Sequence, residues 1–294
     1  MQKERRREAM SILKRRQPNR SRVGDVAVYL VLIMFGAIMV IPLIYAVCHA
    51  FKPLDEIYKF PPTILVRNPT LDNFSDLFVT MGQSWVPFTR YIFNTVFITA
   101  VGTAGQLLIA SMGAYVLAKY DFPGGRKFFT LITTALMFNG YVTSIPSYLI
   151  MAKIGWVDSY LAAFVPAFAA PMGIFLMKQF MEGIPDALLD AAKVDGAKEW
   201  GIFAKIVMPN VKPAWLTLII FSVQGLWNNP QSTYIYSEEL KTLPYALQQI
   251  VAGGVARAGA GAAVTLVMMI VPIGIFIFSE SNILETMASS GIKD

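Results

Sequence analysis

The chain has 294 residues, of which 55% are hydrophobic and 15% are charged. Ordinary soluble domains contain about 45–50% apolar and about 25% charged residues, so this composition indicates a membrane protein and argues against a soluble enzyme. The net charge of +6 does not indicate nucleic-acid binding, because the nine Lys/Arg and three acids of residues 1–25 account for all of it. Cys48 is the only cysteine, which excludes an internal disulfide bond and a cysteine-based metal cluster.

Residues 1–25 form a basic N-terminal tail directly before a long apolar run. Positive charge beside a first span holds that side in the cytoplasm, so we expect a cytoplasmic tail. The run is longer than the apolar region of a signal peptide, about 7–15 residues, and no A-x-A cleavage site follows it. We therefore interpret it as a retained span.

Six uncharged runs of at least 19 residues follow one another along the chain. Because about 20 mostly apolar residues cross a hydrocarbon core of about 30 Å, these runs predict an all-α polytopic membrane protein with six transmembrane helices. The expected spans are 26–50, 89–118, 127–152, 160–181, 211–230 and 260–284. Residues 26–284 then form one transmembrane domain, and residues 285–294 form a C-terminal tail on the same, cytoplasmic side as the N-terminus. The inner segments hold 18 Lys/Arg and the outer segments 7, which agrees with the positive-inside rule.

Two outer segments are long enough to contact an extracellular partner. The first, between spans one and two, is rich in Pro and Asn, which predicts irregular structure with short helices. The second comprises residues 231–258 and is also expected to extend toward such a partner.

The sequence lacks the residues that several kinds of chemistry need. His49 is the single histidine, so it has no second histidine for a metal site and no base–nucleophile arrangement around it. No Asp, Glu, Lys or Arg lies inside the six runs, which disfavours proton-coupled transport, and no G-x-x-x-x-G-K-[ST] loop is present to bind nucleotide. We expect no cofactor in this chain and an energy supply from another chain. A membrane-integral enzyme, a receptor and an ion-coupled secondary transporter remain the alternatives.

Uncharged polar and aromatic side chains occur at membrane depth. Such groups suit an uncharged, hydroxyl-rich solute, although amides also hold transmembrane helices together. The candidates for a substrate path are Asn94, Asn139, Gln224, Trp227 and Asn228.

The cytoplasmic segment 184–213 predicts two short helices separated by a bend. Pro185 suits the first turn of a helix and Asp186 its positive end, and helix-forming residues continue to Val194. Gly196 is a helix stop, a second helix is expected at about 197–207, and Pro209 marks the entry to span five. The segment is either an inert amphipathic connector or a docking surface; the small pair Ala191-Ala192 between Asp190 and Asp195 favours docking.

The spacing within this segment resembles the EAA motif, E-A-A-x(3)-G-x(9)-I-x-L-P, of the permease subunits of ABC-type importers. The matching positions are Asp190, Ala191, Ala192, Gly196, Ile206, Met208 and Pro209. The likeness is closest to the carbohydrate-uptake group, whose extended motif is matched at Pro185, Leu189, Asp195, Ala197 and Pro213. Two positions depart from the pattern: Asp190 stands where Glu is usual, and Met208 replaces Leu.

This resemblance implies a type I ABC importer permease fold in the cytoplasmic (inner) membrane of a bacterium. It further implies a non-catalytic subunit that translocates a carbohydrate delivered by an extracytoplasmic solute-binding protein. A second permease chain and two ATPase subunits, which would bind ATP and Mg, complete the implied assembly. By the same resemblance, segment 184–213 docks on the ATPase, with Asp190 pairing with a basic residue there and Gly196 permitting the bend.

Overall fold

The computed structural model describes residues 22–82, 85–138, 140–254 and 257–290, and within these ranges every regular element is helical. The long helices are α2 (Arg22–Ala50), α5 (Phe88–Lys119), α7 (Gly140–Lys153), α13 (Lys212–Trp227) and α15 (Ala258–Ser290). The shorter ones are α3 (Leu54–Ile57), α4 (Asp72–Gly82), α6 (Gly125–Ala135), α8 (Tyr160–Phe168), α9 (Pro171–Glu182), α10 (Asp186–Val194), α11 (Glu199–Ile202), α12 (Met208–Asn210) and α14 (Leu243–Ala252). The predicted all-α class is confirmed.

Four stretches are long and apolar enough to cross a membrane, namely Gly24–Ala50, Phe88–Lys119, Tyr160–Glu182 and Ala258–Ser279. A fifth candidate is the pair Glu199–Asn210 and Lys212–Trp227, which is bent by 80°. Spans one, two, four and six of the predicted set thus correspond to helical stretches of the expected length. The count of six and the cytoplasmic position of both termini stay predictions, because residues 1–21 and 291–294 lie outside the described part of the chain.

The third predicted span, 127–152, is not one continuous helix. It is divided between α6, which ends at Ala135, and α7, which begins at Gly140. The sequence Asn-Gly at 139–140 favours a turn, and glycine costs about 1 kcal/mol relative to alanine inside a helix. The low helix propensity at this point explains why one apolar run gives two helices.

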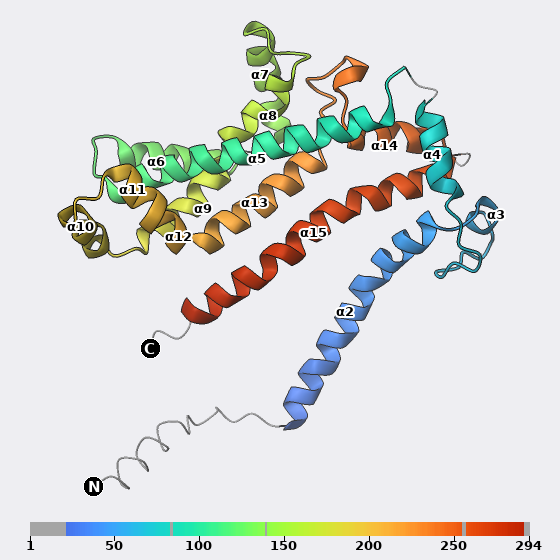
Figure 1. Ribbon diagram of the computed structural model, residues 1–294, viewed down its shortest axis with the longest axis horizontal. Helices are drawn as coiled ribbons and strands as arrows, with labels where there is room; N and C mark the ends of the chain where they lie inside the picture. The colour runs from blue at the N-terminus through green and yellow to red at the C-terminus, as the bar shows by residue number, and fades with distance from the viewer. Residues whose placement is uncertain (1–21, 83–84, 139, 255–256, 291–294) are drawn as a thin grey trace.

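Helix α5 is the central element of the bundle and packs against α8, α9 and α13 (Figure 1). Gly105 of α5 allows one of these close contacts, because a Cβ atom there would lie 2.1 Å from the ring of Phe168. Helix α15 crosses the bundle beside α13 and also contacts α2, α4 and α14. Between helices that lie in a membrane, close van der Waals packing of this kind is a main stabilising term, because lipid is as apolar as the packed side chains.

The two larger clusters of buried side chains lie toward the two ends of this bundle, and a smaller one, which includes Ile98 and Leu226, lies apart from both. One cluster joins α5, α9, α13 and segment 184–213 through residues such as Ala114, Met177 and Val207. The other joins α4, α5, α14 and α15 through residues such as Leu77 and Leu243. Segment 184–213 is therefore part of the packed structure and not a loose connector.

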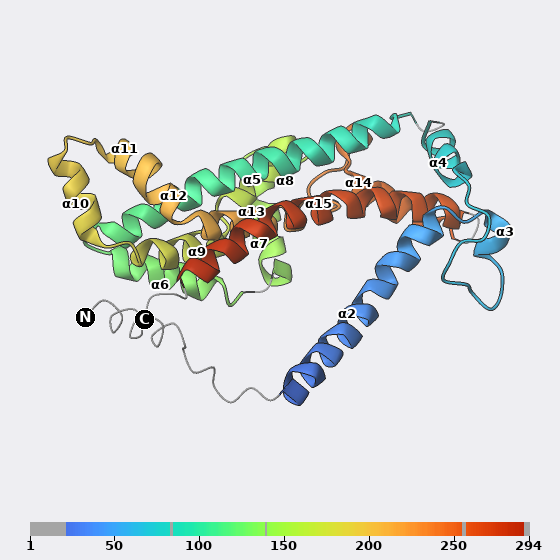
Figure 2. The ribbon, with the colours of Figure 1, turned by 60° about the horizontal axis from the view of Figure 1, so that its bottom comes forward.

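Helix α2 diverges from the other helices, as both ribbon views show (Figures 1 and 2). None of its apolar window is buried within the chain, and Ile33 and Met39 are 67% and 72% exposed. A fully apolar helix requires an apolar environment, so lipid or another protein chain must cover α2.

Candidate functional site

Segment 184–213 folds as α10, a bend, α11, a π-helical turn at Phe203–Val207, and α12. It lies at one end of the bundle, beyond the ends of α5 and α9 (Figure 1). Pro185 precedes the first residue of α10, Asp186, so this helix begins one residue later than predicted. The second helix begins at Glu199 instead of 197, because the bend extends beyond Gly196.

Gly196 forms the bend between the two helices. Its φ of +81° lies in the left-handed region, which only glycine adopts without a steric cost. The N–H of Gly196 donates to the carbonyl of Lys193 at 3.0 Å, and the N–H of Ala197 donates to that of Ala192 at 3.0 Å. These two bonds form a Schellman motif, so the predicted bend at Gly196 is present.

One face of α10 is exposed and carries small or apolar side chains around a single acid. Ala187, Asp190, Ala191 and Val194 share this face at helical spacing and are all exposed; Val194 is 88% exposed. Within the described residues the Asp190 carboxylate has no ion-pair or hydrogen-bond partner. The face therefore offers a flat surface with one free carboxylate.

The opposite face of α10 is buried against the bundle. Leu189 and Ala192 are 5% and 8% exposed and belong to the cluster that includes Met181 and Ile202. Ile206 is half-buried against the same cluster, whereas Asp195 and Pro209 are exposed. The pair Ala191-Ala192 is thus divided between the two faces: Ala191 belongs to the exposed surface and Ala192 to the core.

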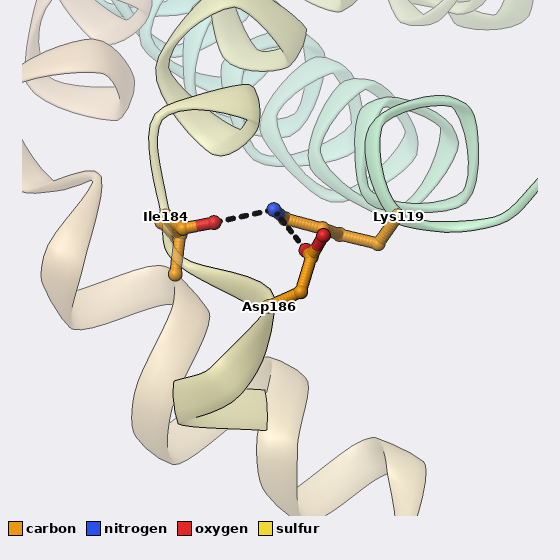
Figure 3. Close-up of polar contacts among 3 residues, drawn as sticks. All are labelled: Lys119, Ile184 and Asp186. Atoms are coloured by element: carbon orange, nitrogen blue, oxygen red, sulfur yellow. Dashed lines mark hydrogen bonds and ion pairs between the residues drawn. The ribbon is translucent and has the colours of Figure 1, made fainter. Parts of the chain in front are cut away.

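A lysine at the end of α5 attaches the start of α10. The ammonium of Lys119 donates to the carbonyl of Ile184 at 2.5 Å and pairs with the carboxylate of Asp186 at 2.8 Å (Figure 3). The Lys119 side chain is 5% exposed and that of Asp186 is 79% exposed. This contact could not be predicted from the sequence. A basic residue at a helix C-terminus is already explained by its favourable interaction with the helix dipole, and the sequence does not indicate a distant partner for it.

A second attachment lies beyond the bend. The hydroxyl of Tyr115, in α5, donates to Glu199 of α11 at 3.1 Å, and Lys193 pairs with the same carboxylate at 3.4 Å. The hydrogen bond from Tyr120 is the main cause that holds the pKa of Glu199 below its ordinary value of 4.5. A carboxyl group with a lowered pKa stabilises the fold at pH values above its ordinary pKa, and this stabilisation is lost only as the pH falls through the lowered pKa. The Glu199 carboxyl is therefore ionised near neutral pH.

The Lys119 contact gives a first prediction. Replacing Lys119 with methionine leaves the buried Ile184 carbonyl without its donor, at a cost of about 1–3 kcal/mol. We expect amide hydrogen exchange of residues 184–195 to become roughly tenfold faster or more, as measured by mass spectrometry on the purified protein. Lys153→Met, which removes an exposed lysine of α7, is the matched control. Unchanged exchange in Lys119→Met would show that this contact does not hold α10.

The residues predicted for a substrate path have different surroundings. Gln224 and Asn228 are exposed on one face of α13, one helical turn apart, and Asn228 donates to the carbonyl of Gln224 at 2.9 Å. Trp227 is 3% exposed and donates to the Met268 carbonyl of α15 at 2.9 Å. Asn139 lies outside the described residues.

Asn94 is fully buried and joins three parts of the chain. Its amide nitrogen donates to the carbonyls of Glu239 and Lys241 at 2.8 and 2.7 Å, and its oxygen accepts from the Tyr160 hydroxyl at 2.7 Å. These contacts fix the segment 238–241 to α5 and α8. Sequence reasoning identified a polar group at this depth, but the structure surrounds it with protein.

The burial of Asn94 gives a second prediction. Asn94→Leu removes three hydrogen bonds, of which the one to the Lys241 carbonyl is buried and two are partly buried, and a buried group left unsatisfied costs about 1–3 kcal/mol. We expect a clearly lower midpoint of thermal unfolding for detergent-purified protein. Asn228→Leu removes only an exposed bond within one helix turn and serves as the control, with a small shift. Equal midpoints for the two variants would contradict a structural role for Asn94.

The family model described as "Binding-protein-dependent transport system inner membrane component" matches residues 19–286. The chain belongs to this family. Its members are non-catalytic membrane permeases of ABC transporters, so the chain is such a permease and a multi-pass membrane protein. The matched range includes α2 to α15 except the last residues of α15.

The permease is similar to curated and solved proteins over most of its length. It is 33% identical over 270 residues to the arabinooligosaccharides transport system permease protein AraQ of Halalkalibacterium halodurans, covering 87% of this chain and 92% of that protein. A permease-like chain of a bacterial ABC transporter involved in the import of the acidic polysaccharide alginate matches with a TM-score of 0.76 and 21% identity, covering 90% of this chain and 99% of that one. An alginate ABC transporter in complex with an alginate pentasaccharide-bound periplasmic protein matches with a TM-score of 0.60 and 16% identity, covering 87% of this chain and 93% of that one. The structural likenesses show the fold that the EAA-type spacing implied.

Proposed function

We propose that this permease carries a carbohydrate across the bacterial inner membrane in an ATP-driven importer. The observation that supports this most directly is the exposed face of α10, with the free carboxylate of Asp190 beside the Gly196 bend. The surface suits docking of another protein, and the EAA-type spacing indicates that this protein is the ATPase. The substrate class follows from the 33% identity to an arabinooligosaccharide permease.

The partners that we propose are a second permease chain, two ATPase subunits that bind ATP and Mg, and an extracytoplasmic solute-binding protein. The alginate transporter in complex with a periplasmic protein supports a binding-protein partner. The second permease chain is supported by α2, whose apolar surface is uncovered by the rest of this chain. The lipid bilayer covers what the second chain leaves exposed.

Segment 184–213 is the proposed coupling loop. Asp190 would pair with a cation of the ATPase, while Ala191 and Val194 allow close approach to its surface. Buried Leu189 and Ala192, with Ile206, connect the loop to the bundle. Movement of the ATPase is thereby transmitted to the membrane helices, and nucleotide and loaded binding protein favour the same bundle state by linkage.

Gln224 and Asn228 are the proposed solute contacts. Both present neutral amides on an unburied face of α13, where they can exchange hydrogen bonds with sugar hydroxyls. Trp227 holds this helix against α15 through its indole N–H and thereby positions the two amides.

The test is reconstitution of the complete importer in proteoliposomes with a panel of labelled carbohydrates. We expect uptake of one oligosaccharide class that requires ATP and the loaded binding protein, and that persists when an ionophore collapses ion gradients. Uptake that stops with the ionophore while ATP is maintained would establish ion-coupled transport instead. ATP-driven uptake of a non-carbohydrate solute alone would overturn the substrate class and retain the permease role.

A further inference from the structure

A polar cavity of about 890 Å³ lies beside the coupling loop, at the same end of the bundle. The end of α5, the connection at 120–124, the first turns of α6 and the side of α9 form its walls. Lys119, which attaches the coupling loop, is the last residue of α5 and immediately precedes this connection. The cavity is therefore at the membrane end that the basic segments of the sequence assign to the cytoplasm.

The cavity has an excess of positive charge. Three cations, Arg126, Lys127 and Lys178, face two acids, Asp121 and Glu182. Lys178 is 8% exposed and pairs with Glu182. Within the described residues the side chains of Arg126 and Lys127 have no ion-pair or hydrogen-bond partner. Two cations in the wall are thus free to bind an anion.

The backbone at the start of α6 also favours the binding of an anion. Arg126 and Lys127 belong to the first turn of this 11-residue helix, no acid occurs in that turn, and no side chain caps its start. Gly124 precedes the helix with a φ of +94°. An uncapped helix start directs unpaired N–H groups and positive dipole charge toward a bound anion, and here it does so beside two free cations.

Apolar side chains continue from the cavity along α6. Phe128 and Leu131 are 52% and 64% exposed, and Phe122 at the cavity edge is 41% exposed. Phe128 and Leu131 lie three residues apart on one face of α6, and this exposed apolar surface is suited to contact with hydrocarbon chains. The ligand that matches both parts is an anion that carries long apolar chains.

We propose that this cavity binds the phosphate-bearing headgroup of an anionic phospholipid of the inner leaflet. Arg126 and Lys127 bind the phosphate, Lys178 maintains the positive potential, and the acyl chains lie on Phe128 and Leu131. Basic pockets between membrane helices on the cytoplasmic side are suited to such headgroups. The site is separate from the solute contacts and from the exposed face of α10, so the proposal does not depend on the identity of the solute.

The test is titration of the detergent-purified importer complex with phosphatidylglycerol, with bound lipid counted by native mass spectrometry. The variant Arg126→Gln/Lys127→Gln should bind it about 30-fold more weakly, since each cation contributes to headgroup affinity. The matched control, Lys59→Gln/Lys153→Gln, removes two exposed lysines outside the cavity and should bind like the parent protein. Phosphatidylcholine carries the same phosphate but no net charge, so it should bind the parent protein more weakly than phosphatidylglycerol and lose less affinity in the cavity variant.

Three outcomes would overturn the proposal. The first is equal phosphatidylglycerol affinity in the parent protein and the cavity variant. The second is equally tight binding of water-soluble glycerophosphoglycerol, which would make this a site for free phosphate esters. The third is loss of the ATPase subunits from the cavity variant with lipid binding unchanged, which would make the two cations a protein contact.

Discussion

Gly196→Pro is expected to abolish both solute-stimulated ATP hydrolysis and transport. Proline fixes φ near −65°, whereas the bend holds Gly196 at +81°. Proline also lacks the N–H that bonds to the Lys193 carbonyl. Residues 195–197 must then rebuild, and α10 loses its orientation relative to α11. We expect the inserted, assembled variant to lose nearly all solute-stimulated ATP hydrolysis and uptake in proteoliposomes.

Gly201→Ala is the matched control for this substitution. Gly201 lies in α11, without a positive φ, and a Cβ atom there would meet nothing within 4 Å. Alanine should therefore be tolerated and slightly favour the helix. If Gly196→Pro inserts normally and retains full stimulated hydrolysis, the bend has no role in coupling.

Asp190→Arg is expected to have the second large effect. The carboxylate is exposed and free within the described residues, so its reversal should not disturb the fold. If Asp190 pairs with a cation of the ATPase, arginine places like charges in a desolvated contact and costs roughly a hundredfold in coupling. Asp190→Ala should cost less, because it removes the attraction without adding repulsion. The measurement is the stimulated ATPase rate of the reconstituted complex.

The same charge reversal at Asp76 provides the control for Asp190. Asp76 is also exposed, on α4 at the opposite end of the bundle from α10 (Figure 1). Asp76→Arg should leave the ATPase stimulation near the parent value. An equal loss in both variants would show a general effect of charge, and no loss at Asp190 would remove this residue from the proposed contact.

The short helices and the bend of segment 184–213 could be predicted from the sequence because their signals are local. Gly196 occupies a position that requires a left-handed residue, and helix propensity defines α10 on one side of it. The attachments of this segment were not predictable in the same way. Lys119 and Tyr115 precede their partners by 67 and 84 residues, and only the packing of α5 against the loop brings them together.

The polar residues at membrane depth show a related limit. The uncharged runs place Asn94 and Asn228 within or at the end of a span, but they do not show which neighbours surround these residues. Asn94 is fully buried and bonds to segment 238–241 and Tyr160, whereas Asn228 is exposed. Likewise, an uncharged run of the right length at 127–152 does not show that its helix is interrupted between Ala135 and Gly140.

Helix α5 connects the two sides of the permease without a hinge. Its 32 residues give a length of about 48 Å at 1.5 Å per residue, and no proline interrupts them. One end holds the coupling loop through Tyr115 and Lys119, and the other holds segment 238–241 through Arg90 and Asn94. If the ATPase docks on segment 184–213 as proposed, a tilt of α5 imposed there would also displace segment 238–241 at its other end. In that mechanism a single straight helix would move the inner and outer ends of this face of the permease together.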